Sequence, residues 1–274
     1  MNKKILFLTI HLPYPPESGA SMYNTYRVLE LLLQTNQVFL ASLLKHNDKS
    51  NTEKFLQETG IEEYYFEELN IERSKLAMVK SFIKGVPLNV FRNSSKTFHQ
   101  KITSIANQYD ILWVDHYEAF QYVPEGFKGK VVLRAHNAWH VMWRRYAEVA
   151  GNLAHKIFAS IESKRVAKVE RKCCDRADLI LCASSDGEYL EPDFKVRARK
   201  FREFMFLGDD CQLNLPVPEY ETLEDSLIYV GTLSWEANVD GLLWFVQGCW
   251  KELRKQYPEL TLYLIGSNPD PRLI

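Results

Sequence analysis

The sequence has little cysteine, no excess of charge of either sign and no long hydrophobic run. Its five cysteines form no C-x-x-C pair and lie mostly in apolar stretches, which favours a reduced, cytoplasmic protein. Thirty-four lysines and arginines against 35 acids leave a formal charge of −1, so nucleic acid is not favoured as a partner. The N-terminal apolar run, Ile5 to Ile10, is too short for a signal peptide or a membrane span.

Several catalytic motifs are also missing. The loop after the first apolar run is neither G-x-G-x-x-G nor a Walker A loop, which lowers the odds of NAD or ATP chemistry. There is no G-x-S-x-G elbow, and His136 and His140 stand at i, i+4 without the glutamate of H-E-x-x-H. These absences count against hydrolases and predict neither a metal site nor a cofactor.

What the sequence does contain is an alternation of strand-like and helix-like stretches. Apolar, β-rich runs occur at residues 4–10, 37–44, 110–114, 130–135 and 178–183, with a weaker one at 63–66. Helical spacing occurs at 21–36, 95–108 and 152–176, and a short helix capped by Ser184-Ser185 is expected next. The long helix is expected to carry Phe158, Ile161, Val166, Val169 and Cys173 on one side. This alternation predicts βαβ units and a parallel sheet.

A second domain is predicted near the end of the sequence. Residues 192–224 are less regular and resemble an inter-domain connection. The alternation then restarts in LIYVGTLSWEANVDGLLWFV (227–246), with a strand at 227–230, a helix from Asn238 that stops before Pro258, and a strand at 260–265. We therefore expect an α/β fold with a Rossmann-like domain at 1–215 and the beginning of a second one at 216–274.

Candidate site residues follow the predicted strands, because ligands of open α/β sheets bind beyond the carboxyl ends of strands. Four places qualify: Ser18-Gly19-Ala20, Asp115-His116, His136-Asn137, and Gly231-Thr232 with Asn238. A histidine at a strand end can exchange protons near neutral pH, although each one taken alone is more often structural. The basic run from Lys195 to Arg202 fits either a solvated face or contact with an anionic lipid surface or a diphosphate.

Together these segments resemble glycosyltransferase family 4, retaining sugar-nucleotide enzymes with two facing Rossmann-like domains (the GT-B fold). HLPYPPESGASMYNTYRVLELL resembles the family's P-x-P-P-x-x-G-G loop and helix, and RAHNAWHVMWRR its H-N-x-E segment. CCDRADLILCASSDGEYL resembles its C-x-x-A-D-x-x-x-x-x-S segment. LIYVGTLSWEANVDGLLWFV resembles the start of a donor domain reading F-V-G-S-x-x-W-x-P-N-x-D. The likeness spans most of residues 3–190 and 226–268.

The resemblance implies a hexosyltransferase-type enzyme in cell-surface polysaccharide synthesis. It would transfer a sugar, with retention, from a nucleotide-diphosphate sugar to a glycan or lipid-linked acceptor, without a required metal or cofactor. His136 would lie beside the transferred sugar, Gly19 near the acceptor and the donor phosphates, and Gly231 near the diphosphate. Ser18, Asn137, Thr232 and Asn238 would complete the binding residues. The implied location is the cytoplasm, with peripheral contact to the inner face of an anionic membrane left open.

The sequence also departs from the family. Ala20 replaces the second loop glycine, Trp139 the glutamate of H-N-x-E, and Thr232 and Ala237 the basic pair of the donor domain. The family's E-x7-E motif would lie downstream of Ile274, so we expect an incomplete donor domain and little activity. A non-catalytic module that binds an acceptor glycan or a partner subunit is the alternative. A sugar-nucleotide epimerase of similar fold is less favoured, because its acid/base carboxylates cannot be picked out.

Overall fold

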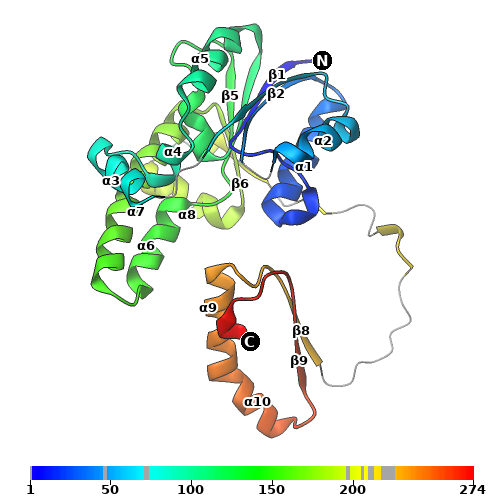
Figure 1. The fold of residues 1–274 in the computed structure, drawn as a ribbon, viewed down its shortest axis with the longest axis vertical. Helices are drawn as coiled ribbons and strands as arrows, with labels where there is room; N and C mark the ends of the chain where they lie inside the picture. Colours follow the sequence, from blue (N-terminus) through cyan, green and yellow to red (C-terminus); the bar gives the residue numbers. More distant parts are fainter. Residues whose placement is uncertain are drawn as a thin grey trace. The chain divides into compact units, whose positions relative to one another are not determined.

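The computed structural model describes residues 2–45, 48–70, 74–195, 198–204, 207–208, 213–216 and 226–274. The chain forms two compact units, Met1–Gly208 and Asp209–Ile274 (Figure 1). The domain boundary predicted between residues 215 and 216 lies beside residues outside the described ranges, so it stays a prediction.

The first unit is built on a seven-stranded sheet. Its strands are β1 (Lys4–Thr9), β2 (Gln37–Leu44), β3 (Glu63–Glu68), β4 (Ile111–Asp115), β5 (Lys130–Arg134), β6 (Leu179–Cys182) and β7 (Phe201–Glu203). They are ordered β3-β2-β1-β4-β5-β6-β7, and all neighbours are parallel. The predicted α/β fold class and its Rossmann-like first unit are confirmed.

Helices occupy the connections between these strands. They are α1 (Ala20–Leu33), α2 (Thr52–Thr59), α3 (Lys75–Lys84), α4 (Leu88–Arg92), α5 (Lys96–Ile105), α6 (Trp139–Val149), α7 (Leu153–Arg176) and α8 (Ser184–Phe194). The helices predicted at 21–36, 95–108 and 152–176 correspond to α1, α5 and α7. Helix α7 begins at Leu153 because the Asn152 side chain accepts a hydrogen bond of 2.8 Å from the backbone N–H of His155.

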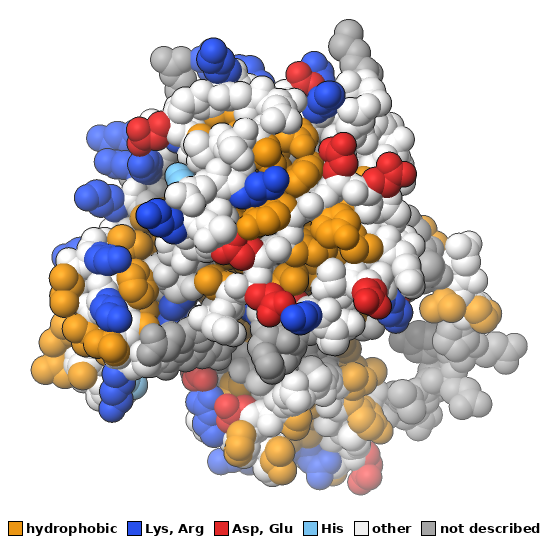
Figure 2. Space-filling model, turned by 45° about the horizontal axis from the view of Figure 1, so that its top comes forward, with side chains coloured by type: hydrophobic (Ala, Val, Ile, Leu, Met, Phe, Trp, Pro, Cys, Tyr) orange, Lys and Arg blue, Asp and Glu red, His pale blue; other side chains and the backbone are white. Residues whose placement is uncertain are grey.

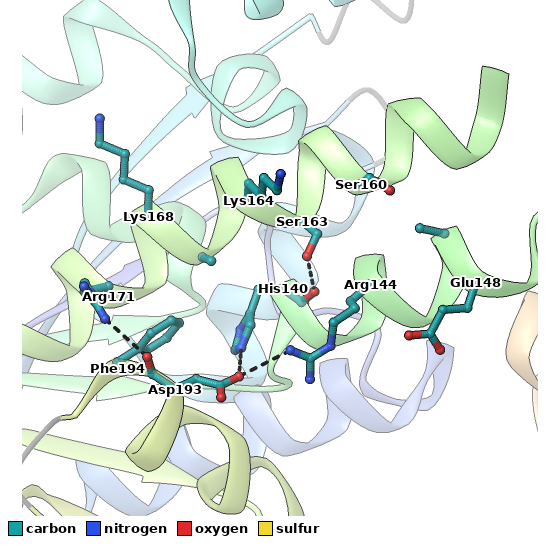
Figure 3. Close-up of a pocket in the computed structure, with 12 residues that line it drawn as sticks. His140, Arg144, Glu148, Ser160, Ser163, Lys164, Lys168, Arg171, Asp193 and Phe194 are labelled. Atoms are coloured by element: carbon teal, nitrogen blue, oxygen red, sulfur yellow. Dashed lines mark hydrogen bonds and ion pairs between the residues drawn. The ribbon is translucent and has the colours of Figure 1, made fainter. Parts of the chain in front are cut away.

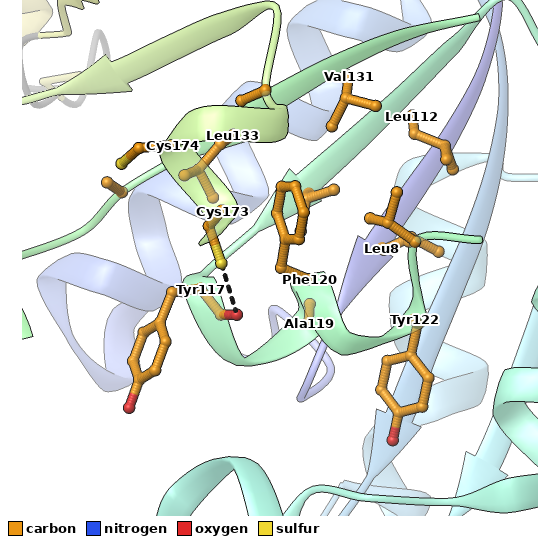
Figure 4. Packing of buried hydrophobic residues seen from close by; sticks show 14 of the residues in the cluster. Leu8, Leu112, Tyr117, Ala119, Phe120, Tyr122, Val131, Leu133, Cys173 and Cys174 are labelled. Atoms are coloured by element: carbon orange, nitrogen blue, oxygen red, sulfur yellow. Dashed lines mark hydrogen bonds between the residues drawn. The ribbon is translucent and has the colours of Figure 1, made fainter. Parts of the chain in front are cut away.

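The sheet is buried on both faces. Leu6 and Leu8 of β1 belong to a core cluster with α5 and α7, part of which is drawn in Figure 4. Ile5 and Phe7 belong to a second cluster with α1 and α2. Alternate side chains of a strand point to opposite faces, so a strand covered on both sides must be apolar throughout. The continuous apolar runs of the sequence follow from this arrangement.

Two predicted details of the connections are wrong. Phe201–Glu203, expected in an irregular connection, is the edge strand β7, which pairs with β6. A strand of three residues is too short to produce a recognisable hydrophobic pattern in the sequence. The cap predicted at Ser184-Ser185 is also misplaced, since α8 already begins at Ser184 and its N-cap position is held by Ala183.

The apolar face predicted for α7 is only partly correct. Val166 and Cys173 are buried, but Ile161 is 39% exposed. Glu162 and Glu170 lie on the buried face of α7 instead of Ile161. They can be buried because both carboxylates accept hydrogen bonds from backbone N–H groups of other elements. A charged residue that is paired inside a protein looks like a surface residue in the sequence.

The second unit has a parallel pair of strands, β8 (Ser226–Val230) and β9 (Thr261–Ile265). Between them run α9 (Glu236–Phe245), a π-helical turn (Val246–Trp250) and α10 (Lys251–Gln256). The predicted strand, helix and strand are confirmed, although the helix begins two residues before Asn238.

Gly266 is expected to be essential to the second unit. A Cβ atom at this position would overlap the backbone carbonyl oxygen of Gly231, so Gly266→Ala must push the ends of β8 and β9 apart. We expect a loss of about 1–3 kcal/mol, measured as faster hydrogen exchange in β8 and β9. Gly248→Ala is the control: its Cβ would meet nothing within 4 Å, so exchange should stay the same or slow slightly. Equal exchange rates in the two variants would contradict the prediction that β8 and β9 cannot pair normally with a side chain at position 266.

Candidate active site

The candidate site lies where the strand order reverses. From β1 the chain continues to β2 and β3 on one side, and then crosses to β4 on the other side of β1. Such a switch point leaves a crevice at the carboxyl ends of the two central strands. His11 follows β1, Asp115 ends β4, and His136 follows β5, so all three reach this edge of the sheet.

Asp115 is the centre of a buried polar cluster. Its carboxylate accepts hydrogen bonds from Arg134 Nη1 at 3.0 Å and from His136 Nε2 at 2.5 Å. Asp115 and Arg134 are 2% and 3% exposed. Burial by itself opposes ionisation of this carboxyl, but the charge and hydrogen bonds of Arg134 and His136 outweigh it and hold the Asp115 pKa well below its usual range. The cluster therefore contains a fixed buried ion pair.

The hydrogen bonds assign a tautomer to His136. Because Nε2 faces the carboxylate of Asp115, it carries a proton whether the ring is charged or neutral, and in the neutral ring Nδ1 is left as an acceptor. Nδ1 accepts a hydrogen bond of 2.9 Å from the hydroxyl of Ser21, which is exposed at the start of α1. Carboxylate, imidazole and hydroxyl thus form a line from the core to the surface. A ligand hydroxyl that displaced Ser21 would meet an oriented basic nitrogen.

Two more histidines pack around this line. Burial, followed by the charge of Lys45, lowers the pKa of His11 to about 4. Burial, followed by the neighbouring His136, lowers the pKa of His116 well below its ordinary value. The His116 ring lies 5.3 Å from that of His136, centroid to centroid. His11 and His116 are therefore neutral near pH 7, so they add no charge around the Asp115–His136–Ser21 line.

His116 also has a strained backbone. Its φ of 83° is in the left-handed region, which residues other than glycine adopt uncommonly because their Cβ is crowded there. Residues in this conformation persist where their surroundings hold them, and they cluster at functional sites. The strain lies directly after the carboxyl end of β4, beside Asp115.

The start of α1 supplies positive potential beside His136. Gly19 holds the N-cap position without a side-chain bond, and the first intrahelical bond runs from the N–H of Tyr23 to the oxygen of Gly19. The N–H groups of residues 20–22 precede that bond and face outward from the helix end. Ser18 is exposed, and the space over Gly19 is open. The arrangement can accommodate an anion.

The structure groups the predicted site residues within each unit. In the first unit, Ser18 and Gly19 open α1, and His136 is joined to α1 through Ser21. Asn137 is half-buried, and no hydrogen bond joins its side chain to the described part of the chain. In the second unit, Gly231, Thr232 and Asn238 lie together after β8: the Asn238 side-chain amide donates to the Thr232 oxygen at 3.0 Å. The Gly231 N–H donates to the oxygen of Ile265 at 3.0 Å.

Sequence reasoning missed Arg134, Ser21 and Thr25. The Thr25 hydroxyl lies 3.2 Å from Asp115 Oδ1 and accepts a hydrogen bond of 3.1 Å from Arg134 Nη1. One signal was present for Arg134: a charged residue ends the buried strand KVVLR, and a buried cation requires a carboxylate partner. No local pattern distinguishes Ser21 or Thr25 from ordinary helix residues.

The described residues of the basic run Lys195 to Arg202 form local hydrogen bonds. Lys200 donates to the backbone oxygens of Cys174 and Asp175 at the end of α7, and Arg202 donates to the oxygen of Arg199. Arg197 lies outside the described residues. Within the described ranges, no group of three or more His, Cys, Asp or Glu side chains is arranged to hold a metal ion. No described helix is long and apolar enough to cross a membrane.

Comparison with known proteins bears on the fold. No family model matches the chain, and no curated protein matches it significantly. Among solved structures, the chain is similar to the N-terminal domain of Candida albicans trehalose-6-phosphate phosphatase, with 13% identity, a TM-score of 0.59, and coverage of 97% of this chain and 64% of that one. It is also similar to Anabaena HepE in complex with UDP and glucose, with 15% identity, a TM-score of 0.51, and coverage of 99% and 71%. The fold is GT-B-like.

A third similar structure is the glycotransferase of kitacinnamycin, with 14% identity, a TM-score of 0.50, and coverage of 98% of this chain and 67% of that chain. The chain thus spans about two thirds of the length of these three structures. At such identities the likeness establishes the fold alone.

Proposed function

We propose that this protein is a retaining glycosyltransferase related to family 4. It would transfer a hexose-type sugar from a nucleotide-diphosphate sugar to a glycan or lipid-linked acceptor. The observation that carries the proposal is the Asp115–His136–Ser21 line, which reaches the surface beside the open first turn of α1. The similar structure of Anabaena HepE holds UDP and glucose, which supports a nucleotide sugar as the donor.

The proposed roles follow from charge. Negative charge develops on the leaving diphosphate as the sugar departs, and helix N-termini stabilise such charge without a metal ion. We assign this role to the first turn of α1, with Ser18 and Gly19, and to the turn after β8, with Gly231, Thr232 and Asn238. His136 would accept a hydrogen bond from a sugar hydroxyl through Nδ1, and Asn137 would line the same edge.

The cellular location and the pathway are proposed from the sequence motifs. We propose a cytoplasmic enzyme of cell-surface polysaccharide synthesis that requires neither metal nor cofactor. Within the described ranges, the cysteines at positions 173, 174, 182 and 249 form no disulfide bond, which suits a reducing compartment.

Titration calorimetry with nucleotide sugars at millimolar concentration tests the donor. UDP-, GDP- and ADP-linked hexoses would be compared against residues 1–274. If the coding sequence continues past codon 274 with an E-x7-E motif, they would also be compared against the longer protein. We expect weak binding by residues 1–274 and tighter binding by the longer protein, because that motif grips the donor in the resembled family. A longer protein that binds no nucleotide sugar refutes the proposal.

His136→Ala is expected to weaken binding of the preferred nucleotide sugar about fivefold. The substitution removes one hydrogen bond to the sugar, and a bond of this kind contributes about 1 kcal/mol. Saturation-transfer NMR titration measures the change, and it remains usable at millimolar affinity. His99→Ala is the control, because His99 is exposed on α5. Unchanged affinity in His136→Ala would remove His136 from the sugar site.

A second candidate is a non-catalytic module completed by a partner subunit. One observation favours it: Ile228, Val230 and Ile265 of the β8–β9 sheet are each more than half exposed. Parallel sheets are normally covered on both faces, so this surface can accept another protein layer. A stop directly after codon 274, together with no nucleotide-sugar binding, would favour the module over the enzyme.

A further inference from the structure

The α6–α7 hairpin has an exposed apolar stripe at its tip. Leu153, Ile157 and Ile161 recur every four residues and so lie on one side of α7. Leu153 and Ile157 are 73% and 52% exposed, and Val149 at the end of α6 is 72% exposed. Single exposed apolar residues are ordinary, but a contiguous row at the end of a hairpin marks an interaction surface.

Helix α3 extends this surface. It packs beside α7, because the Phe82 ring lies 5.6 Å from the Phe158 ring and Arg165 donates to the backbone oxygen of Ser81. Its outward residues Leu76, Val79 and Ile83 are also exposed, Ile83 by 81%. We call Leu76, Val79, Ile83, Val149, Leu153 and Ile157 the apolar tip.

Positive charge follows the apolar stripe along α7. Lys164, Lys168 and Arg171 continue the side of the helix that carries Leu153, Ile157 and Ile161. At 1.5 Å per residue, the apolar part is about 12 Å long and the basic part about 10 Å long. Hydrophobic and basic side chains are interspersed over the α3, α6 and α7 side of the first unit in Figure 2. Helix α7 thus changes from apolar to basic with distance from the tip.

The basic part lines a groove of about 760 Å³ between α6, α7 and the end of α8. Arg144, Lys164, Lys168 and Arg171 line it, and Figure 3 shows them along the two helices. Of its two acids, Asp193 already pairs with His140 at 3.0 Å and lies 3.6 Å from Arg144. Lys164 and Lys168 make no ion pair with the described residues.

The charge of the hairpin contrasts with that of the chain. Residues 139–176 contain nine lysines and arginines and four acids, a net charge of +5, whereas the whole chain carries −1. Two of those acids, Glu162 and Glu170, are buried and bonded. Glu170 of α7 accepts hydrogen bonds from the backbone N–H groups of Trp139 and His140 of α6, which joins the two helices at the base of the hairpin. A rigid, cationic hairpin with an apolar end is complementary to an anionic surface with an apolar interior.

We propose that the apolar tip docks on an anionic lipid bilayer. The tip enters the boundary between headgroups and acyl chains, which lies about 5–10 Å deep, and the cations of α7 and the groove contact lipid phosphates. This surface replaces the run Lys195 to Arg202 as the place of membrane contact. The inference concerns a separate surface and does not depend on the proposed sugar transfer.

Vesicle co-sedimentation of the full chain tests the docking. The probes are phosphatidylcholine vesicles with and without about 30% phosphatidylglycerol, at about 0.15 M salt. We expect binding only to the anionic vesicles. The variants Lys164→Glu/Lys168→Glu and Leu153→Ser/Ile157→Ser should each weaken it at least about tenfold. All four positions are exposed, so circular dichroism melting should show that the variants remain folded.

Lys251→Glu/Lys255→Glu is the matched control. It makes the same change in net charge at the same spacing on α10 and should bind like the parent. Equal loss in the control, or equal binding to neutral vesicles, would overturn the proposal. The proposal would also be overturned if the parent chain did not bind anionic vesicles. The same holds if the parent chain bound no vesicles but formed a dimer that the variant Leu153→Ser/Ile157→Ser does not form. That last result would assign the tip to a second copy of the chain.

Discussion

Arg134→Met is expected to lower the free energy of unfolding of the first unit by about 3–5 kcal/mol. The guanidinium donates to Asp115 at 3.0 Å and to the Thr25 hydroxyl at 3.1 Å, and it lies over the Phe204 ring. Methionine fills similar space but leaves the buried Asp115 carboxylate without its main counter-charge. Removing one partner of a buried pair costs far more than the pair itself contributes, because the remaining charge stays desolvated.

Strand β5 provides the control for this prediction. Lys130→Met removes the other cation of the strand, whose ammonium donates to Asp178 at 2.8 Å. The Lys130 side chain is 74% exposed, so its ion pair contributes no more than about 1 kcal/mol. Urea unfolding at pH 8, followed by tryptophan fluorescence, measures both variants. If Arg134→Met costs no more than Lys130→Met, then Asp115 is not the buried, charged centre inferred above.

Glu118→Gln is expected to raise stability at pH 8 while leaving it nearly unchanged near pH 4. Glu118 is 3% exposed, and its carboxylate accepts a hydrogen bond of 2.7 Å from Asn93 Nδ2. Burial raises the pKa of Glu118 to about 7, despite the opposing charge of Lys45 and the hydrogen bonds it accepts. A glutamine has a similar shape and keeps an oxygen for Asn93, but it cannot ionise.

The direction of the effect follows from linkage. A carboxyl group whose folded-state pKa is raised contributes stability that is fully present below its unfolded pKa, about 4.3, and is lost as pH rises through about 7. The parent should therefore lose about 3 kcal/mol from this group between pH 4 and pH 8, and Glu118→Gln should not. His11 acts in the opposite sense: its lowered pKa stabilises the fold above about pH 6.5, and this is lost towards pH 4.

The difference between parent and variant isolates Glu118, because His11 is present in both. Urea unfolding at intervals from pH 4 to pH 8 gives the two profiles, and Glu125→Gln, at an exposed position, is the control. A stability difference that does not grow with pH would show that Glu118 is already ionised, or exposed, in the folded protein.

Much of the candidate site could be predicted because it depends on strand ends. Asp115, His116 and His136 each follow an apolar run, and parallel strands bring their carboxyl ends to one edge of a sheet. The partners of these residues could not be predicted. Arg134 binds Asp115 across neighbouring strands, and Ser21 reaches His136 from a helix 115 residues earlier in the chain. Contacts at such separations leave no periodic signal.

The sequence by itself determined the alternation of strands and helices, the α/β class and the positions after which site residues occur. These depend on local spacing, because a strand buried on both faces must be apolar throughout. Only the tertiary structure decided which polar residues are buried and which apolar ones are exposed. Glu162 and Glu170 are inside because backbone N–H groups meet them, whereas Leu153 and Ile157 are outside because the hairpin extends past the core. Burial depends on what packs opposite a residue, and the residue's own chemistry does not specify that partner.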